Sequence, residues 1–125
     1  QNIAINLQLN DLETCVIRAN KEQLRQVFNN LIKNALQASK NDTEITISLR
    51  IRDFKSIVEI ADQGAGISEE LRDKVFQPNF TTKSSGMGLG LAITKNIITS
   101  LGGEIYFETS NAGTTFYIEL PLKDK

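Results

Sequence analysis

The sequence predicts an α+β fold, a two-layer sandwich in which one mixed, mostly antiparallel sheet is covered on one face by three helices. Strand-like segments arrive in pairs with helix-like segments between the pairs, an order that argues against strict βαβ winding. The chain has 125 residues and 40% hydrophobic content, which suits one core. We therefore expect a single domain over residues 1–125.

The first part of the chain predicts two strands and a long helix. Residues 3–9 and 14–19 alternate in polarity, and the intervening Asn10-Asp11 favours a turn. On this alternation Cys15 is a small buried hydrophobic side chain. From Asn20, the expected N-cap, apolar residues recur at three- and four-residue spacing as far as Ala38, which predicts an amphipathic helix.

The remainder predicts two more pairs of strands and two helices. These elements are strands 44–52 and 56–62, a short helix over 68–76, a helix over 89–101, and strands 104–109 and 114–120. Ser68 is the expected cap of the short helix. Residues 77–90 hold one proline and three glycines, so we expect an irregular loop there, long enough to act as a lid.

Charge and composition exclude several classes of function. The 14 basic and 15 acidic residues nearly balance, so the chain lacks the basic field that non-specific nucleic-acid binding requires. With no histidine and one cysteine, it holds no thiol–imidazole pair, zinc ligand set or internal disulfide. No apolar run approaches the roughly 18 residues of a membrane span. We expect a cytoplasmic domain without membrane or nucleic-acid contacts, monomeric in isolation.

Asp62 is an unusual residue at the end of a predicted strand. Strand parity places it with Val58 and Ile60 on the apolar face that the helices are expected to cover. An ionised carboxylate only accepts hydrogen bonds, so it needs donors when buried. Backbone N–H groups of the following turn can supply them, and so can a bound ligand. Gly64 and Gly66 fit both interpretations, because glycine serves tight turns and close ligand approach alike.

The long helix has an amide-rich polar side. Asn30 and Asn34 lie one turn apart, with Lys33 and Gln37 beside them. Amide oxygens suit a hard cation such as Mg²⁺. The alternative is an amide-rich surface without a ligand.

A glycine-rich stretch precedes the third helix. Glycines 86, 88 and 90 leave backbone N–H groups and a helix N-terminus that suit a polyphosphate, although a glycine hinge is the alternative. Familiar phosphate motifs do not fit. A Walker loop needs glycine where Thr82 precedes Lys83, and a dinucleotide fingerprint needs glycine at Glu69 or Leu91.

With these stretches the sequence resembles the ATP-binding catalytic domain of bacterial sensor histidine kinases, within the gyrase, heat-shock chaperone, histidine kinase and MutL (GHKL) superfamily. QLRQVFNNLIKNALQAS is similar to the N box, DQGAGI to the first glycine box, VFQPNFTTK to the F box and GMGLGLAIT to the second glycine box. GTTFYIELP resembles the usual last strand, and NLIKNALQAS is most similar to the nitrogen-regulation type. The four boxes occur in order over nearly the whole chain.

The resemblance implies the Bergerat fold and a Mg-ATP site. Asp62 would accept the adenine amino group, and Thr114 would support the adenine beside it. Asn34 would bind Mg²⁺, and Asn30 would hold the N-box position one turn earlier, both with catalytic roles. The other nucleotide-binding residues implied are Lys33, Gln37, Gly64, Gly66, Ile67, Phe80, Thr81, Thr82, Lys83, Gly86, Met87, Gly88, Leu89, Gly90 and Leu91.

The resemblance also implies a protein histidine kinase of two-component signal transduction. The domain would donate the γ-phosphate of ATP to a histidine on a separate dimerisation domain, and a response regulator would be served indirectly. Because the chain contains no histidine, it would be a fragment of a longer protein, inactive in autophosphorylation alone. Related ATPases carry a glutamate base where this chain has Asn30, so we expect weak or no ATP hydrolysis.

Two alternatives remain open at this point. One is an anti-sigma-type protein serine kinase of the same superfamily, which phosphorylates a serine on a partner protein. The other is a nucleotide-sensing interaction module that binds ATP or ADP and transfers nothing.

Overall fold

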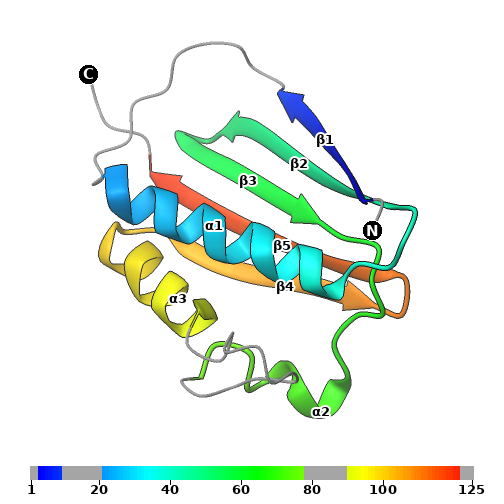
Figure 1. The fold of residues 1–125 in the computed structure, drawn as a ribbon. Coiled ribbons are helices and arrows are strands. Elements are labelled where there is room, and N and C mark those ends of the chain that lie inside the picture. The colour runs from blue at the N-terminus through cyan, green and yellow to red at the C-terminus, as the bar shows by residue number, and fades with distance from the viewer. Residues whose placement is uncertain (1–2, 10–20, 78–89, 122–125) are drawn as a thin grey trace.

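The computed structural model describes residues 3–9, 21–77 and 90–121 (Figure 1). Its elements are β1 (Ile3–Leu9), α1 (Lys21–Ala38), β2 (Thr43–Arg52), β3 (Lys55–Ala61), α2 (Glu69–Arg72), α3 (Gly90–Ser100), β4 (Glu104–Ser110) and β5 (Gly113–Pro121). Most expected boundaries are confirmed to within two residues. The expected strand over 14–19, with Cys15, and the expected cap Asn20 lie outside the described residues. No helix in the described part is long and apolar enough to cross a membrane.

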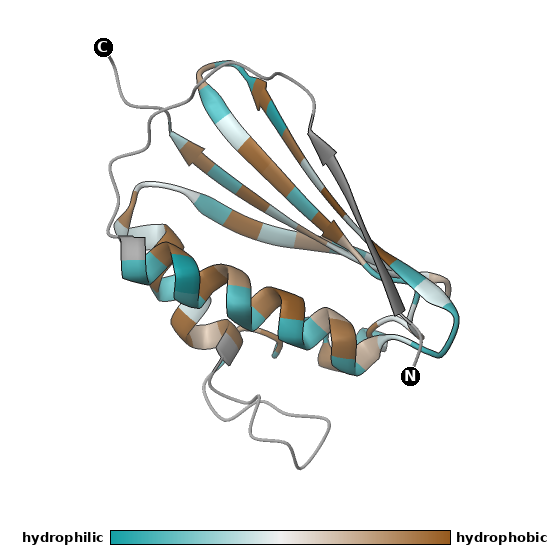
Figure 2. Cartoon of the chain, turned by 45° about the horizontal axis from the view of Figure 1, so that its top comes forward, coloured by the Kyte–Doolittle hydropathy of each residue, from teal (hydrophilic) through white to brown (hydrophobic). Residues whose placement is uncertain are grey.

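The strands form one sheet in the order β1-β2-β3-β5-β4. β1 pairs with β2 in parallel, and the other neighbouring strands pair antiparallel, so the sheet is mixed and mostly antiparallel. Figure 2 shows two layers, with α1 and α3 together on one face of the sheet. α2 lies apart from them, on the connection that leads out of β3 (Figure 1). The predicted fold class is confirmed, with α1 and α3 as the helices that cover the sheet.

The core lies between these two helices and the sheet. α1 buries Val27, Leu31 and Ala35, whose four-residue spacing forms one stripe. β5 alternates strictly, with buried side chains at every second position from Thr114 to Leu120. The opposite face of the sheet carries the stacked pair Tyr106 and Tyr117, with ring centroids 5.0 Å apart, and the buried Ile57. One face is therefore covered by helices, and the other has no helix on it among the described residues.

A two-residue turn joins β2 to β3. Arg52 pairs directly with Lys55, and the two intervening residues, Asp53 and Phe54, have φ values of 53° and 62°. Positive φ at both positions defines a type I′ turn, which normally selects Asn or Gly. Phe54 occupies this strained conformation with 84% of its surface exposed.

The short helix differs most from the prediction. α2 covers only Glu69–Arg72, and the backbone N–H groups of Lys74 and Gln77 then donate to carbonyls three residues earlier at 2.9 and 3.0 Å. After these tight turns, Val75 lies in the hydrophobic core and Phe76 packs against it. The chain therefore tightens into short turns here and does not continue as a regular α-helix. Ser68 stands at the predicted N-cap position, although its side chain makes no capping hydrogen bond.

Candidate functional site

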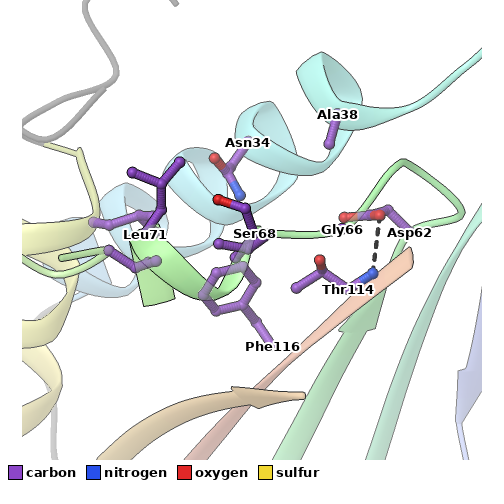
Figure 3. Close-up of a pocket in the computed structure, with 11 residues that line it drawn as sticks. Asn34, Ala38, Asp62, Gly66, Ser68, Leu71, Thr114 and Phe116 are labelled. Atoms are coloured by element: carbon purple, nitrogen blue, oxygen red, sulfur yellow. Dashed lines mark hydrogen bonds between the residues drawn. The ribbon is translucent and has the colours of Figure 1, made fainter. Parts of the chain in front are cut away.

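A cavity of about 300 Å³ lies at the end of the sheet where β3 leads into the glycine-containing loop. Its walls come from α1, this loop, α2, α3 and β5. The lining residues are Asn34, Ala38, Asp62, Gly66, Ile67, Ser68, Leu71, Val75, Leu91, Thr114 and Phe116. Figure 3 shows Asn34 on α1 on one side of this space and the neighbouring Asp62 and Thr114 on the other. An apolar enclosure with a few polar groups is the usual character of a small-molecule site.

Asp62 follows β3 and is buried, with 7% of its surface exposed. Its Oδ1 accepts hydrogen bonds from the backbone N–H groups of Gly64 at 2.9 Å and Thr114 at 3.2 Å. The backbone N–H of Asp62 in turn donates to the Thr114 carbonyl oxygen at 2.8 Å. The protein's own chain therefore satisfies one carboxylate oxygen, as the turn interpretation predicted.

The other oxygen, Oδ2, receives no hydrogen bond from the described residues, although Asp62 lines the cavity. Burial raises the pKa of the Asp62 carboxyl above its ordinary value of 3.8, and the two backbone donors oppose that rise. A ligand N–H at Oδ2 would stabilise the ionised form further. The two interpretations of Asp62 are thus compatible, one for each oxygen.

The glycines of this loop are explained by contacts within the protein. A Cβ at Gly64 would clash with the carbonyl oxygen of Ala38, at the end of α1. Gly66 has a φ of +84°, and a Cβ there would clash with the carbonyl oxygen of Ser110. The loop is therefore pressed between α1 and the β4–β5 turn. The close approach that these glycines permit is to the protein's own backbone.

Two threonine hydroxyls connect this loop to β4 and β5. Thr114 is buried on the helix-covered face, as its strand parity predicts, and its Oγ1 lies 2.8 Å from Oγ1 of Thr109. The Thr109 hydroxyl oxygen also accepts a hydrogen bond from the Ile67 backbone N–H at 2.9 Å. Sequence analysis missed Thr109. The available signal was its parity with Ile105 and Phe107 on the helix-covered face of β4.

The amide-rich side of α1 divides into two parts. Asn34 lines the cavity. Asn30 does not line it, and its Nδ2 donates to Oγ1 of the fully buried Thr94 on α3 at 3.3 Å. Lys33 is exposed and Gln37 half-buried, and neither lines the cavity. α1 thus turns one amide toward the cavity and uses another to hold α3.

Several apolar lining residues were not among the expected site residues. Leu71 and Val75 are four residues apart in the segment predicted as a helix, and Phe116 shares the parity of Thr114. Phe116 also belongs to a cluster with Phe76 and Phe107, in which ring centroids are 5.5 to 6.2 Å apart. This cluster fixes one wall of the cavity to the sheet.

The remaining expected residues fall at or beyond the edge of the described region. Gly90 is the first residue of α3, and Leu91 lines the cavity. The other lid and phosphate positions lie outside the described residues. They are Phe80, Thr81, Thr82, Lys83, Gly86, Met87, Gly88 and Leu89.

Comparison with known proteins identifies the family. Residues 19–124 match the model of the family described as histidine kinase-, DNA gyrase B-, and HSP90-like ATPase. The chain therefore belongs to this ATPase family, which implies that it binds ATP.

Similar proteins are sensor kinases. The chain is 36% identical over 122 residues to sporulation kinase D of Bacillus subtilis (strain 168). This alignment covers 97% of the chain and 24% of that protein. It is 40% identical over 114 residues to the signal transduction histidine-protein kinase AtoS of Escherichia coli (strain K12), covering 90% of this chain and 19% of that protein. The chain thus spans about a quarter or less of these relatives.

Solved structures agree. The catalytic domain of histidine kinase ThkA, in a nucleotide-free form, matches with a TM-score of 0.85 and 34% identity over 95% of this chain and 78% of that chain. ThkA in complex with the response regulator protein TrrA matches with a TM-score of 0.82 and 32% identity over 97% of this chain and 34% of that chain. The resemblance to histidine kinase catalytic domains is confirmed.

Proposed function

We propose that this chain is the ATP-binding catalytic domain of a longer sensor histidine kinase. It binds Mg-ATP and presents the γ-phosphate to a histidine on a separate dimerisation domain. The observation that carries the proposal is Asp62. Its Oδ1 accepts two backbone hydrogen bonds, while Asp62 also lines the cavity, where Oδ2 can accept a hydrogen bond from a ligand. Because the chain belongs to an ATPase family, the ligand we propose is ATP.

The cavity suits the adenine base. Oδ2 of Asp62 accepts the exocyclic amino group, while Ile67, Leu71 and Leu91 supply apolar surface for the ring. A volume of about 300 Å³ is at the low end of the range for ligand pockets, so this space suits a base better than a whole nucleotide. The ribose and phosphates would extend along α1, past Asn34, toward the N-terminus of α3, whose partial positive charge favours phosphate.

Asn34 would hold the metal ion through its side-chain oxygen. Mg²⁺ is usually bound by one or two protein groups together with phosphates and water, so a single amide on the cavity wall fits this chemistry. When bound, Mg²⁺ neutralises charge on the phosphates during phosphoryl transfer.

The chain supplies positioning and leaves the acceptor to another domain. It contains no histidine to receive a phosphoryl group. The side chain of Asn30 is an amide, which cannot take a proton from water at neutral pH, and it is hydrogen-bonded to Thr94. We therefore expect weak hydrolysis of bound ATP. Because ThkA is known in complex with the response regulator TrrA, a response regulator is the partner we propose downstream of this kinase.

Calorimetry with ATP, with and without Mg²⁺, tests the binding step. We expect one site, and Asn34→Ala should weaken binding with Mg²⁺ more than binding without it. Equal losses in both conditions would contradict metal coordination by Asn34. Absence of ATP binding to the unaltered chain would refute the proposed function.

Addition of the dimerisation domain tests the transfer step. Acid-labile phosphate on that domain is the expected product, since phosphohistidine is acid-labile. Acid-stable phosphoserine on a partner protein would instead support the serine kinase. Nucleotide binding without any transfer would support the sensing module.

A further inference from the structure

We propose that Thr109 is a positioning residue for base selectivity, which acts by fixing Thr114 as a hydrogen-bond donor toward the cavity. The inference rests on the proposed function, because it concerns how the same site distinguishes adenine from guanine. Thr109 itself does not line the cavity. It acts through its hydroxyl contact with Thr114 and through the hydrogen bond that it accepts from the Ile67 backbone N–H.

Thr109 lies at a junction of three chain segments. Its Oγ1 accepts the Ile67 backbone N–H at 2.9 Å, lies 2.8 Å from Oγ1 of Thr114, and lies 3.4 Å from the carbonyl oxygen of Gly113. A Cβ at Gly66 would also meet this hydroxyl and the neighbouring Ser110 carbonyl. The glycine loop, β4 and β5 therefore share one hydroxyl group.

Two arrangements of the hydroxyl protons keep the 2.8 Å contact, because either threonine can donate in it. If Thr114 donates, the Thr109 proton is left for the Gly113 carbonyl at 3.4 Å, which is longer than an ordinary hydroxyl–oxygen hydrogen bond. If Thr109 donates, the Thr114 proton is left for the cavity, where a ligand acceptor can take it at ordinary length. An acceptor in the cavity therefore favours the second arrangement.

This arrangement is complementary to adenine and opposed to guanine. Along its outer edge adenine presents an amino donor beside the N1 acceptor, whereas guanine presents a carbonyl acceptor beside an N1–H donor. Asp62 offers an acceptor to the first position, and the Thr114 hydroxyl offers a donor to the second, directly or through one water molecule. Guanine would set acceptor against acceptor and donor against donor.

The test compares Thr109→Val, which keeps the shape and removes the hydroxyl, with Thr109→Ser, which retains the hydroxyl. Calorimetry measures binding of ATP, GTP and inorganic tripolyphosphate. For Thr109→Val we expect ATP to bind about 10-fold more weakly, with GTP and tripolyphosphate changed by less than about 2-fold. Thr109→Ser should stay within about 3-fold of the unaltered chain for ATP. Thr115→Val, on the opposite face of β5, is the matched control.

A double-mutant cycle separates positioning from general damage. If Thr109 acts through Thr114, the Thr109→Val change should have little further effect on ATP binding in a Thr114→Val background. A merely structural role would weaken ATP and GTP alike and would persist in that background. Either result overturns the inference.

A measurement on the unaltered chain covers the case in which Thr109→Val does not fold. The ATP analogue 1-deaza-ATP lacks the N1 acceptor, and we expect it to bind about 10-fold more weakly than ATP. Equal affinity for the two would overturn the inference while leaving the proposed function intact. Loss of ATP binding itself would remove both.

Discussion

Asp62→Asn separates the observed backbone contacts of this carboxylate from its proposed contact with the adenine base. An asparagine can keep its amide oxygen at the Oδ1 position, where the N–H groups of Gly64 and Thr114 determine its orientation. The NH₂ group then replaces Oδ2 and faces the cavity as a donor. An adenine amino group would meet a second donor in place of an acceptor.

The size of the effect follows from the bonds lost. A hydrogen bond to a charged group contributes about 1.5–3 kcal/mol, and the opposed donors add the cost of two unpaired N–H groups. The total, on the order of 3 kcal/mol, corresponds to about 100-fold weaker ATP binding. Folding should not suffer, because a neutral amide avoids the cost of burying a charge, which is the main cause of the raised pKa of Asp62. Asp62→Ala is a less specific probe, since it would leave two buried N–H groups without an acceptor.

Calorimetric titration with ATP and urea unfolding at neutral pH, each on both proteins, measure the two effects. The expected result is strongly reduced ATP affinity with an unfolding free energy equal to or above that of the unaltered chain. ATP affinity within about 3-fold of the unaltered chain would refute the assignment of Oδ2 to the base. A large loss of stability would refute the division of the two oxygens.

Three other predictions concern pH and backbone conformation. Because folding raises the pKa of Asp62, its contribution to stability is complete below 3.8 and is lost as pH rises through the raised value. Urea unfolding should therefore show the unaltered chain losing stability relative to Asp62→Asn with increasing pH, and a constant difference would contradict this. Gly66→Ala forces a side chain into positive φ against Ser110 and should cost more than about 2 kcal/mol by urea unfolding, whereas the control Ala65→Gly should cost less than about 1 kcal/mol. Phe54→Gly relieves the strained turn and should raise stability by up to about 1 kcal/mol; a decrease would show that Phe54 makes a compensating contact.

Local periodicity was sufficient to predict the features that depend on neighbouring residues. The four-residue spacing of Val27, Leu31 and Ala35 predicts α1 and its buried face, and strand parity places Asp62 and Thr114 on the side that the helices cover. These predictions succeed because helix and strand geometry fix the direction of each side chain from its position in the element.

Periodicity could not predict contacts between distant segments. Thr114, which donates to Asp62, is 52 residues further along the chain, and Thr109 is 42 residues from Ile67. Asn30 and Asn34 look equivalent in the sequence, and only the position of α3 beside α1 gives Asn30 a partner in Thr94. The early end of α2 likewise follows from the packing of Phe76 on β4 and β5, which no local signal shows.

The two backbone hydrogen bonds to Asp62 have a consequence for the proposed nucleotide site. Gly64 and Thr114 belong to the protein, so they hold the carboxylate in place with or without a ligand. Departure of a base bound at Oδ2 would expose a single oxygen, which water could solvate without any change in the surrounding backbone. The proposed site would therefore be preformed for each incoming nucleotide, and little binding free energy would be needed to rebuild it.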